Sequence, residues 1–486
     1  MTERDWPMDT ATTQPPACME WQDLSFLVGS GRTRSLVAKP ASIDECRRVL
    51  EWCRENGLTL CPRGSGRSYG DMALNDGQAL LDVTRLNRII EFDEVQRQVR
   101  VEAGVRLIDI FREFHHRNLT LPSSPTESHS SVSGAICANV NGKDGWHVGS
   151  FGNQVVSMTM LLASGELVEI DKSHELFNVV IGGMGLTGVI VEATLQLKPI
   201  NSPYLDVTCI PATNVDALLE TLASVERSND LAVVWIDAYA RGDRVGRSVI
   251  HAARWAERDD TEEERRAYVQ AGYERLSRHR RFGLAVHEFF GPMLSLMLNA
   301  QRLMLPVFNR LYFAMNSMKK SLGRSSYSEL FLKFSFEASF TVPPAHLVCG
   351  PYGYTLQLTF PKGEAREAIV ELLEICQTSP CPPVTTVLRA HKRDEGLISF
   401  SEDGYSLNFE FHPKKRHRDA SRKVIDQLLE ATINRGGKLH LTKDHVATPE
   451  QFRRLYPRYR QLLRYKRKLD PGVLFTSDLA RRVGII

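Results

Sequence analysis

The chain has 486 residues, of which 42% are hydrophobic and 24% charged, and its formal net charge is +3. This length and composition are those of a globular protein with two or three domains, and the charge is too small to indicate a nucleic-acid-binding protein. Nine cysteines are scattered without a CxxC pair, which excludes a zinc-type spacing and indicates a reducing compartment. Because no signal peptide and no long apolar run are visible, the sequence predicts a cytoplasmic protein without membrane spans.

A glycine-rich loop follows the first predicted helix and strand. The helix is predicted over 42–56, where a capping box precedes apolar residues at helical spacing, and residues 1–20 before it are expected to be disordered. A short strand over 58–61 leads into three glycines within residues 62–71. Backbone N–H groups of such a loop can converge on phosphate oxygens, so we interpret it as the cradle for a dinucleotide pyrophosphate. An ordinary Gly/Ser surface loop is the alternative.

A second stretch of small residues spans 122–155, after predicted strands over 79–83 and 99–102 and a predicted helix over 107–116. It contains SGAICA and then NGKDGWHVGSFGN, which is too long for an idle connection in a compact domain. Small side chains let a backbone approach a planar ring or a phosphate closely. We therefore interpret this stretch as a second cofactor contact, with a surface Ω-loop as the alternative.

The sequence GGMGLTG at 182–188 contains the GxGxxG pattern of dinucleotide-binding proteins. A hairpin is predicted over 158–170 before it, and the alternating residues 189–197 after it predict a strand. The Rossmann fingerprint requires a helix after the glycines, so this context argues against a Rossmann domain. A glycine turn that leads into a strand beside the cofactor fits better.

The middle of the chain changes character, and residues 200–250 alternate between predicted strands and helices of a second domain. Residues 253–281 are strongly charged and predict a solvated helix. Residues 289–318 are rich in Leu, Met and Phe and lie between basic flanks. A buried helical pair interrupted by Pro306 is the preferred interpretation, and the alternative is an interfacial patch that admits a lipid-linked substrate at a membrane surface.

The C-terminal part begins with a predicted strand over 438–444 that ends in the adjacent pair Lys443 and Asp444. A helix is predicted from Thr448, because Pro449 occupies the first helical position after a capping side chain. Before this part, the second domain is completed by predicted strands over 354–360, 384–389 and 405–411 and predicted helices over 364–376 and 419–435.

Four motifs occur in order across nearly the whole chain: RGSGRSYGD, SGAICANVNGK with GSFGN, GGMGLTG before a strand, and KLDPGVLF. In them the sequence resembles flavoprotein oxidases of the p-cresol methylhydroxylase (vanillyl-alcohol oxidase) superfamily. Within it, RSYGD, GLTGVI, TKD and FTSDLARR are similar to the decaprenylphosphoryl-ribose oxidase family. The resemblance implies an α+β fold with a two-subdomain FAD-binding domain over 21–200, completed by a C-terminal return over 438–486. An inserted substrate domain over 201–437, an antiparallel sheet covered by helices, would cover the isoalloxazine ring.

The resemblance also implies the residues that bind FAD. Many superfamily members link the flavin to a histidine at the position of Arg67, and arginine cannot form that bond, so non-covalent FAD is expected. Asn141 stands where the family has a histidine, and the second loop has fewer glycines than the family pattern. The expected cofactor-binding residues are Arg63, Gly64, Ser65, Gly66, Arg67, Ser68, Tyr69, Pro125, Ser133, Gly134, Ala135, Cys137, Asn141, Gly142, Ser150, Gly185, Gly188 and Ile190.

Catalytic and substrate-binding residues are implied in the same way. Lys443 is expected to face the flavin near the reacting hydroxyl, with Tyr69 as a hydrogen-bond donor in the same pocket. Lys143 is the expected cation for a substrate phosphate or the cofactor, and Gln357 and Asn408 are expected on the substrate side. Asn408 stands where the mycobacterial relatives carry a cysteine. If the resemblance is set aside, the alternative is that Lys443 forms a surface ion pair with its neighbour Asp444.

The predicted function is that of an FAD-dependent oxidoreductase that oxidises a secondary alcohol of a sugar by hydride transfer to the flavin N5 atom. A polyprenylphosphate-linked ribose is the candidate substrate, with a short-chain dehydrogenase partner that reduces the keto product and contact with the inner face of a membrane. No metal is expected. The alternatives are an aldonolactone or alditol oxidase that acts on a soluble polyol, and a flavin-binding protein without turnover.

Overall fold

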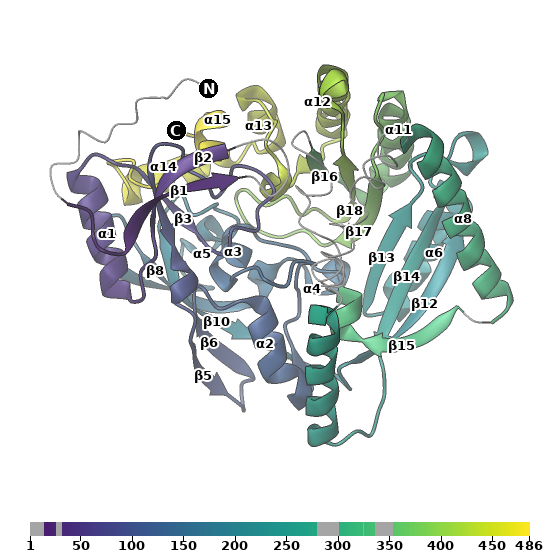
Figure 1. The fold of residues 1–486 in the computed structure, drawn as a ribbon, viewed down its shortest axis with the longest axis horizontal. Coiled ribbons are helices and arrows are strands. Elements are labelled where there is room, and N and C mark those ends of the chain that lie inside the picture. Colours follow the sequence, from purple (N-terminus) through teal and green to yellow (C-terminus); the bar gives the residue numbers. More distant parts are fainter. Residues whose placement is uncertain (1–13, 26–31, 279–300, 324, 336–352) are drawn as a thin grey trace.

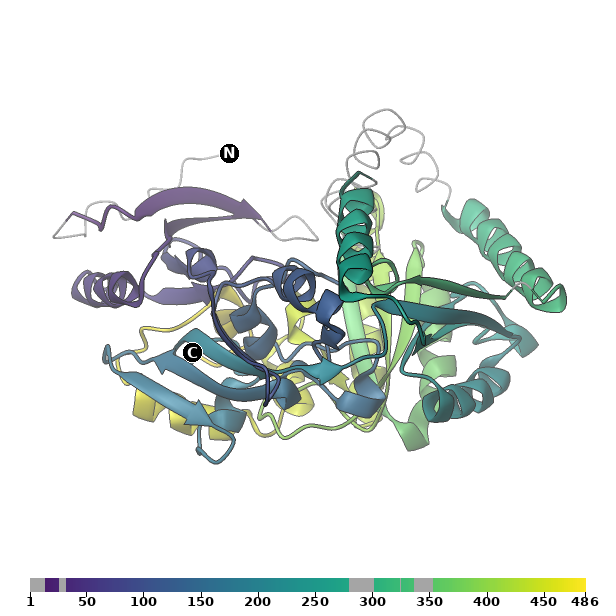
Figure 2. The ribbon, with the colours of Figure 1, turned by 90° about the horizontal axis from the view of Figure 1, so that it is seen from below.

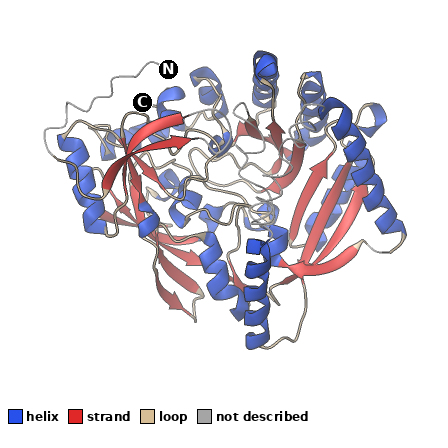
Figure 3. Cartoon of the chain, viewed as in Figure 1, coloured by secondary structure: helices blue, strands red, loops and turns tan. Residues whose placement is uncertain are grey.

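The computed structural model describes residues 14–25, 32–278, 301–323, 325–335 and 353–486. Two smaller sheets lie on one side of this part of the chain and a large sheet on the other, with helices packed on all three (Figures 1 and 3). The stretch expected to be disordered, 1–20, falls mostly outside the described residues, although Met19 and Glu20 begin the first strand.

The first sheet holds the strand that leads into the glycine loop. Its strands are β1 (Met19–Ser25), β2 (Arg32–Ala38), β3 (Leu60–Arg63) and β4 (Ala79–Asp82), in the order β1-β2-β4-β3. Helix α1 (Ile43–Glu55) begins after Ser42, whose side chain accepts the N–H of Glu45. Its apolar side packs against this sheet, which confirms the helix predicted over 42–56.

The second sheet is antiparallel and contains the predicted hairpin, β8 (Val155–Leu161) with β9 (Leu167–Asp171). The other strands are β5 (Ile89–Asp93), β6 (Gln98–Glu102) and β10 (Val189–Gln196), and the order is β5-β6-β10-β8-β9. Strand β10 follows GGMGLTG directly, so the predicted strand is confirmed and the GxGxxG match starts no helix. Between these strands the chain forms α2 (Leu107–Phe114), the two-residue strand β7 (Leu119–Thr120), α3 (Val132–Cys137), α4 (Gly145–Val148) and α5 (Phe177–Val180); β7 pairs with β11 (Lys198–Pro199).

The third sheet has eight strands in the order β15-β12-β14-β13-β17-β18-β16-β19, and all neighbours pair antiparallel. Cross-strand partners share a face, so Asn408 lies on the same face as its partners Gln357 and Val387. The strands are β12 (Tyr204–Ala212), β13 (Leu231–Ile236), β14 (Ser248–Trp255), β15 (Ser326–Leu330), β16 (Tyr354–Pro361), β17 (Thr385–His391), β18 (Gly404–Phe411) and β19 (Lys438–Leu439).

Helices cover both faces of the large sheet. Helices α6 (Val215–Ser228), α11 (Ala365–Thr378) and α12 (Arg418–Asn434) pack against the sheet, and α11 packs against both of the others. Helix α8 (Gln301–Ser321) lies on the other face (Figure 2), where its Tyr312 packs on Trp235. Trp235 is the cross-strand partner of Val387, so α8 and Asn408 lie on the same face. The face of the sheet that carries Gln357 and Asn408 therefore has α8 at its outer end.

Two predictions for the middle of the chain are wrong. Pro306 does not interrupt a helix, because α8 continues through it. The apolar side chains of α8 are also not buried, and the structure therefore contradicts a buried helical pair over the described part of 289–318; residues 289–300 lie outside the described residues. The charged stretch 253–281 begins inside β14, and its helix, 262–278, packs buried side chains such as Tyr273 against the core, so it is solvated on one side only.

The end of the chain returns to the first sheet. The N–H of Leu60 in β3 donates to the carbonyl of Leu474 (2.7 Å), and the N–H of Thr476 donates to the carbonyl of Leu60 (3.1 Å). Figure 1 shows the C-terminal helices on the same side of the molecule as the first strands. These helices are α13 (Pro449–Leu455), which begins with the predicted cap at Thr448, α14 (Tyr459–Leu469) and α15 (Asp478–Arg482).

Candidate active site

An open cavity, with about 1140 Å³ of empty space that includes its solvent-filled opening, lies between the two smaller sheets and the large sheet. The glycine loop, residues 125–141 and residues 184–190 line it on one side, and β16, β17 and residues 440–443 line it on the other. A concave site of this kind, lined by backbone and small side chains with a few convergent polar groups, is typical of small-molecule and cofactor sites. The two glycine-rich or small-residue stretches singled out in the sequence thus meet in one cavity.

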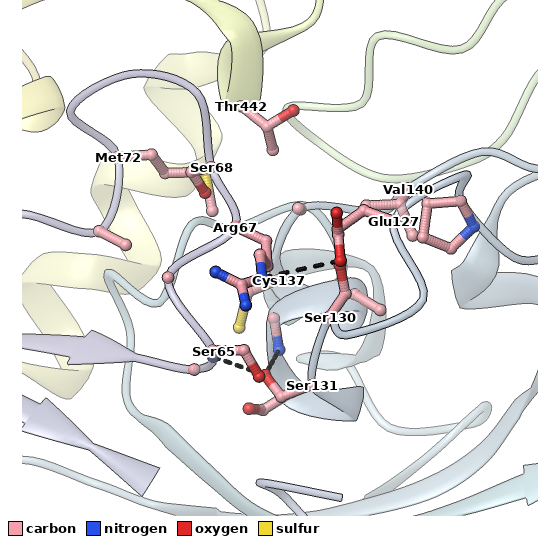
Figure 4. A pocket seen from close by; sticks show the side chains of 18 of the residues that line it. Ser65, Arg67, Ser68, Met72, Glu127, Ser130, Ser131, Cys137, Val140 and Thr442 are labelled. Atoms are coloured by element: carbon pink, nitrogen blue, oxygen red, sulfur yellow. Dashed lines mark hydrogen bonds and ion pairs between the residues drawn. The ribbon is translucent and has the colours of Figure 1, made fainter. Parts of the chain in front are cut away.

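The two predicted cradles touch each other at Ser131, the residue before α3 (Figure 4). Its hydroxyl oxygen accepts the backbone N–H of Ser65 (3.4 Å) and of Gly134 (3.3 Å). A β-carbon on Gly64 would lie 2.0 Å from the same oxygen, so a side chain at this position would displace the Ser131 hydroxyl from this contact. The hydroxyl of Ser65 is buried and has no hydrogen-bond partner among the described residues, which is the condition expected of a group that binds a ligand.

Two arginines of the glycine loop have different surroundings. The guanidinium of Arg63 donates to the carbonyl of Ala73 (2.7 Å) and so connects the two ends of the loop. Burial lowers the pKa of Arg63. Arg67 is more exposed and lies 3.7 Å from the carboxylate of Glu127, across the mouth of the cavity (Figure 4). Arg67 is therefore the cation available at the cofactor side of the cavity wall.

A buried ionic cluster ties the glycine loop to the C-terminal part. Arg482 of α15 donates to both carboxylate oxygens of Asp71 (2.7 and 2.9 Å) and to the carboxylate of Asp444 (2.9 Å). The other oxygen of Asp444 accepts the N–H groups of Val446 and Ala447. Asp444 is thus a partner of Arg482 and not of its neighbour in sequence, which corrects the predicted Lys–Asp pair.

The backbone continues this connection into the cavity. The N–H of Tyr69 donates to the carbonyl of Thr442 (2.7 Å), and a β-carbon on Gly70 would lie 2.0 Å from the carbonyl oxygen of Asp444. The strand predicted over 438–444 is therefore wrong beyond β19: Leu441–Lys443 form a short 3₁₀ helix, because their backbone pairs with the glycine loop and not with a strand. This turn places the side chain of Lys443 in the cavity.

Lys443 lies among charged groups. Its Nζ atom donates to the side-chain oxygen of Asn408 (2.6 Å) and lies 5.6 Å from the ring centroid of Tyr69. Burial, together with the positive charge of Arg389, lowers the pKa of Lys443 to about 7, although the carboxylate of Glu410 acts in the opposite direction. An amine with such a pKa can take up and release a proton near neutral pH, which a general base requires.

Arg389 of β17 is the clearest cavity residue that the sequence interpretation missed. Its guanidinium donates to the hydroxyl of Thr126 (2.5 Å) and to the carbonyl of Asn141 (3.4 Å), so it connects the large sheet to the second cradle. A charged residue within the otherwise uncharged strand TTVLRA was a usable signal, since a charge in the middle of such a sheet needs a partner or a function. Arg389 adds positive charge beside Lys443.

Gln357 and Asn408 are direct cross-strand partners on β16 and β18. The amide of Gln357 donates to the hydroxyl of Ser406 (3.0 Å), which also contacts the Nε2 atom of His391 (2.6 Å). Burial lowers the pKa of His391 to about 3, so its ring is neutral near pH 7. Only Gln357 of the two predicted substrate-side residues lines the cavity itself, whereas Asn408 lies behind Lys443.

Asn141, which replaces the histidine of the family, is committed to a polar network between the smaller sheets and the large one. Its amide donates to the hydroxyls of Ser401 (2.6 Å) and Ser150 (3.2 Å), and the latter donates to the carboxylate of Asp394 (2.8 Å). Asp394 also accepts the amide of Asn139 (2.8 Å). The side chain of Asn141 therefore joins the two halves of the molecule at the edge of the cavity.

The structure brings together most, but not all, of the predicted site residues. Lys143 contacts the carbonyl and the ring of Phe334, 4.3 Å from its centroid, at the large sheet. Four predicted residues lie outside the cavity wall besides Asn408: Gly142, Lys143, Ser150 and Gly188. Besides Arg389, the sequence interpretation did not single out several residues that do line it: Met72, Thr126, Glu127, Ser130, Ser131, Val140, Met184, Val189, His440 and Thr442.

The donor groups around the cavity fit FAD. The unpartnered hydroxyl of Ser65, the contact at Gly64 that leaves no room for a β-carbon, and the nearby Arg67 suit phosphate oxygens. Lys443 and Arg389 also line the cavity, and positive charge there suits the negative charge that a reduced flavin carries.

Comparisons with known proteins agree with this fit. Residues 35–171 match the family of FAD binding domains, and residues 353–483 match the D-arabinono-1,4-lactone oxidase family. The chain is 29% identical to the decaprenylphosphoryl-beta-D-ribose oxidase of Mycolicibacterium smegmatis, over 95% of this chain and 97% of that protein. It is 24% identical to the L-gulonolactone oxidase of Mus musculus, over 93% and 96% respectively. The D-arabinono-1,4-lactone oxidase of Eremothecium gossypii is 30% identical over 44% of this chain and 40% of its own length.

The two matched families cover the cradle and the part of the large sheet that carries Gln357, Arg389 and Lys443. The fold is of the two-subdomain type found in the p-cresol methylhydroxylase superfamily, with the cofactor cavity at its boundary with the large sheet. The chain is therefore an FAD-dependent oxidoreductase that acts on CH–OH groups and is related to the sugar and aldonolactone oxidases.

Proposed function

We propose that the protein oxidises a secondary alcohol on a polyprenylphosphate-linked pentose, the ribose-to-keto step of an epimerisation. One observation carries the proposal: Lys443, whose pKa burial lowers to about 7, lines the same cavity as the two predicted phosphate cradles. The relative named as a decaprenylphosphoryl-beta-D-ribose oxidase, which aligns over nearly the full length of both chains, supports this substrate class. A keto sugar must then be reduced, and a short-chain dehydrogenase is the proposed partner.

Oxidation of such an alcohol removes a proton from oxygen and a hydrogen with two electrons from carbon. FAD, when bound, supplies the acceptor for the latter. Lys443 takes the hydroxyl proton, since its amine is neutral in a large share of molecules near pH 7. Tyr69 and Gln357 orient the hydroxyl, and Arg389 provides the positive charge at this end of the cavity.

A soluble aldonolactone or polyol is the second candidate substrate. The match of residues 353–483 to the D-arabinono-1,4-lactone oxidase family supports it, because that segment includes Arg389 and Lys443.

An anaerobic screen of free and lipid-linked sugars, read by loss of flavin absorbance, tests the function. Rapid bleaching by a polyprenylphosphoryl pentose and slow bleaching by free polyols and lactones are expected. Faster bleaching by an aldonolactone would contradict the lipid-linked assignment and support the second candidate. A flavin that no sugar bleaches would contradict both.

FAD is proposed to be bound without a covalent link, since Arg67 occupies the position at which relatives of the superfamily carry the linked histidine. Acid precipitation of the holoprotein is expected to give a colourless pellet and a yellow supernatant. A pellet that stays yellow after washing in denaturant would contradict this proposal.

Helix α8 supports contact with a membrane surface. Its buried side carries three polar groups: Asn309, Asn316 and the Tyr312 hydroxyl. The amide of Asn309 donates to the carboxylate of Asp237 (2.8 Å). The outer side of the helix is apolar. None of the helices in the described ranges combines the length and apolar character needed to cross a bilayer. The outer side chains, 43% to 73% exposed, are Leu303, Met304, Val307, Phe308, Leu311, Met315 and Met318, followed by Leu322.

An exposed apolar stripe of this size marks an interaction surface, and Arg310 and Lys319 flank it with positive charge. The protein is expected to cosediment with vesicles of anionic phospholipid. The double variant Phe308→Asp, Leu311→Asp is expected to bind at least about tenfold more weakly, because two apolar side chains no longer leave water. Leu167→Asp, an exposed leucine of β9, is the matched control. Equal cosedimentation of the double variant and wild type would contradict the membrane contact.

A further inference from the structure

A carboxylate lies behind Lys443, on the side away from the cavity. Asn408 accepts the Nζ–H of Lys443 through its side-chain oxygen at 2.6 Å and also forms a side-chain hydrogen bond with Glu410. Because the amide oxygen is used by Lys443, the amide N–H is the group that donates to Glu410. Hydrogen bonds therefore link the three side chains in sequence, and the oriented amide of Asn408 connects the cation to the carboxylate.

The geometry of β18 explains why Asn408 and Glu410 can interact. Asn408 and Glu410 are two residues apart on β18 and so lie on the same face of the large sheet. The cross-strand partners of Glu410 are Thr355 on β16 and Thr385 on β17, neither of which carries a charge. Among the described residues, Lys443 is the charged group that acts on Glu410. Within the part of the chain that the structure describes, Glu410 thus interacts with Asn408 and with the charge of Lys443.

We infer that Glu410 is a positioning residue: through Asn408 it fixes the Lys443 side chain at the cavity and stabilises the ammonium ion that forms when Lys443 takes up a proton. This inference rests on the proposed function, in which Lys443 is the base. It goes beyond that function because it assigns a role to a residue outside the cavity wall. It also gives Asn408 a role as the bridge between the two charges.

Other groups around Lys443 act in the opposite direction or are neutral. Arg389 of β17 opposes the protonated amine, and burial keeps the rings of His391 and His440 neutral. Tyr69 of the glycine loop presents its ring. Burial raises the pKa of Glu410, and the charge of Lys443 lowers it. Glu410 is therefore the group that offsets Arg389, and its removal would leave the repulsion between Arg389 and the lysine unbalanced.

The test compares holoenzyme of wild type with Glu410→Gln, which keeps the size of the side chain and removes its charge. The first readout needs no substrate: the rate at which acetic anhydride labels Lys443 is followed against pH by peptide mass spectrometry. The second is the pH profile of flavin reduction by the sugar that bleaches it fastest. A base must be neutral, so both rates rise with pH through the pKa of Lys443.

Without the negative charge, the ammonium form is less stable, so both profiles are expected to shift by about one pH unit toward lower pH in Glu410→Gln. Glu329→Gln on β15, where Glu329 pairs with Lys333 (3.0 Å) far from the cavity, is the control and is expected to leave both profiles in place. Asn408→Leu removes the bridge but keeps the carboxylate, and it serves if Glu410→Gln does not fold. It is expected to shift the profiles in the same direction by less.

A labelling profile that does not move in Glu410→Gln, or in Asn408→Leu where only that variant folds, would overturn the inference. A merely structural role would lower stability or rate at every pH without moving either midpoint. If the labelling midpoint moves but the reduction profile does not, the inference about Glu410 holds and the role of Lys443 as base fails. The two proposals can therefore fail separately.

Discussion

Replacing Lys443 by alanine is expected to leave FAD bound and to slow substrate-driven flavin reduction by roughly 10²–10⁴-fold, the usual contribution of a general base. The residues proposed to hold the cofactor lie on the glycine loop and around Ser131, so the change does not touch them. In wild type, the reduction rate is expected to rise with pH and to level off above about 7, the pKa of Lys443.

Stopped-flow absorbance under anaerobic conditions measures this effect. Lys438→Ala is the matched control, because Lys438 lies only five residues away on β19 but pairs with Glu402 outside the cavity wall. Its flavin should be reduced at the wild-type rate. Wild-type bleaching in Lys443→Ala would remove Lys443 from the chemistry, and loss of flavin from the variant would show a binding role instead.

Replacing Arg482 by methionine is expected to destabilise the protein by roughly 3–5 kcal/mol, the cost of leaving buried charges without their partner. Two carboxylates, Asp71 and Asp444, would lose the guanidinium that bridges them. Both belong to the segments that carry Tyr69 and Lys443, so the variant should also lose FAD more readily. Thermal unfolding and the fraction of flavin retained after gel filtration measure the two effects.

Arg482→Lys is expected to recover little of the stability that Arg482→Met loses, since one ammonium cannot make the two parallel hydrogen bonds that the guanidinium makes with Asp71. Arg453→Met, which removes an exposed arginine of α13, is the control and should change the unfolding temperature little. An Arg482→Met variant that unfolds at the wild-type temperature and keeps its flavin would contradict the role assigned to this cluster.

Local sequence signals were sufficient for much of the fold. The cap at Ser42, the hairpin of β8 and β9, and the strand after GGMGLTG depend on neighbouring residues, and the structure has all three. The two cradles could also be recognised, because glycine and small residues have few other reasons to concentrate in this way. That they meet at Ser131 is a contact over 66 residues, which no local pattern contains.

The predictions that failed depend on long-range partners. The stretch Lys438–Asp444 alternates like a strand, but its backbone pairs with the glycine loop, and Asp444 finds Arg482 rather than Lys443. Arg389 acquires its position from Thr126, 263 residues away. In α8 the apolar residues do follow helical spacing, yet spacing identifies an apolar side without saying whether protein, lipid or water lies against it.

The link between Asp71 and Arg482, 411 residues apart, has a consequence for biosynthesis. A ribosome that adds about 5–20 residues per second needs roughly 20–80 s to reach Arg482 after it has made Asp71. Throughout that interval the segment that carries the glycine loop and Asp71 lacks its ionic partner. Stable flavin binding is therefore expected only after Arg482 has been made and has reached Asp71.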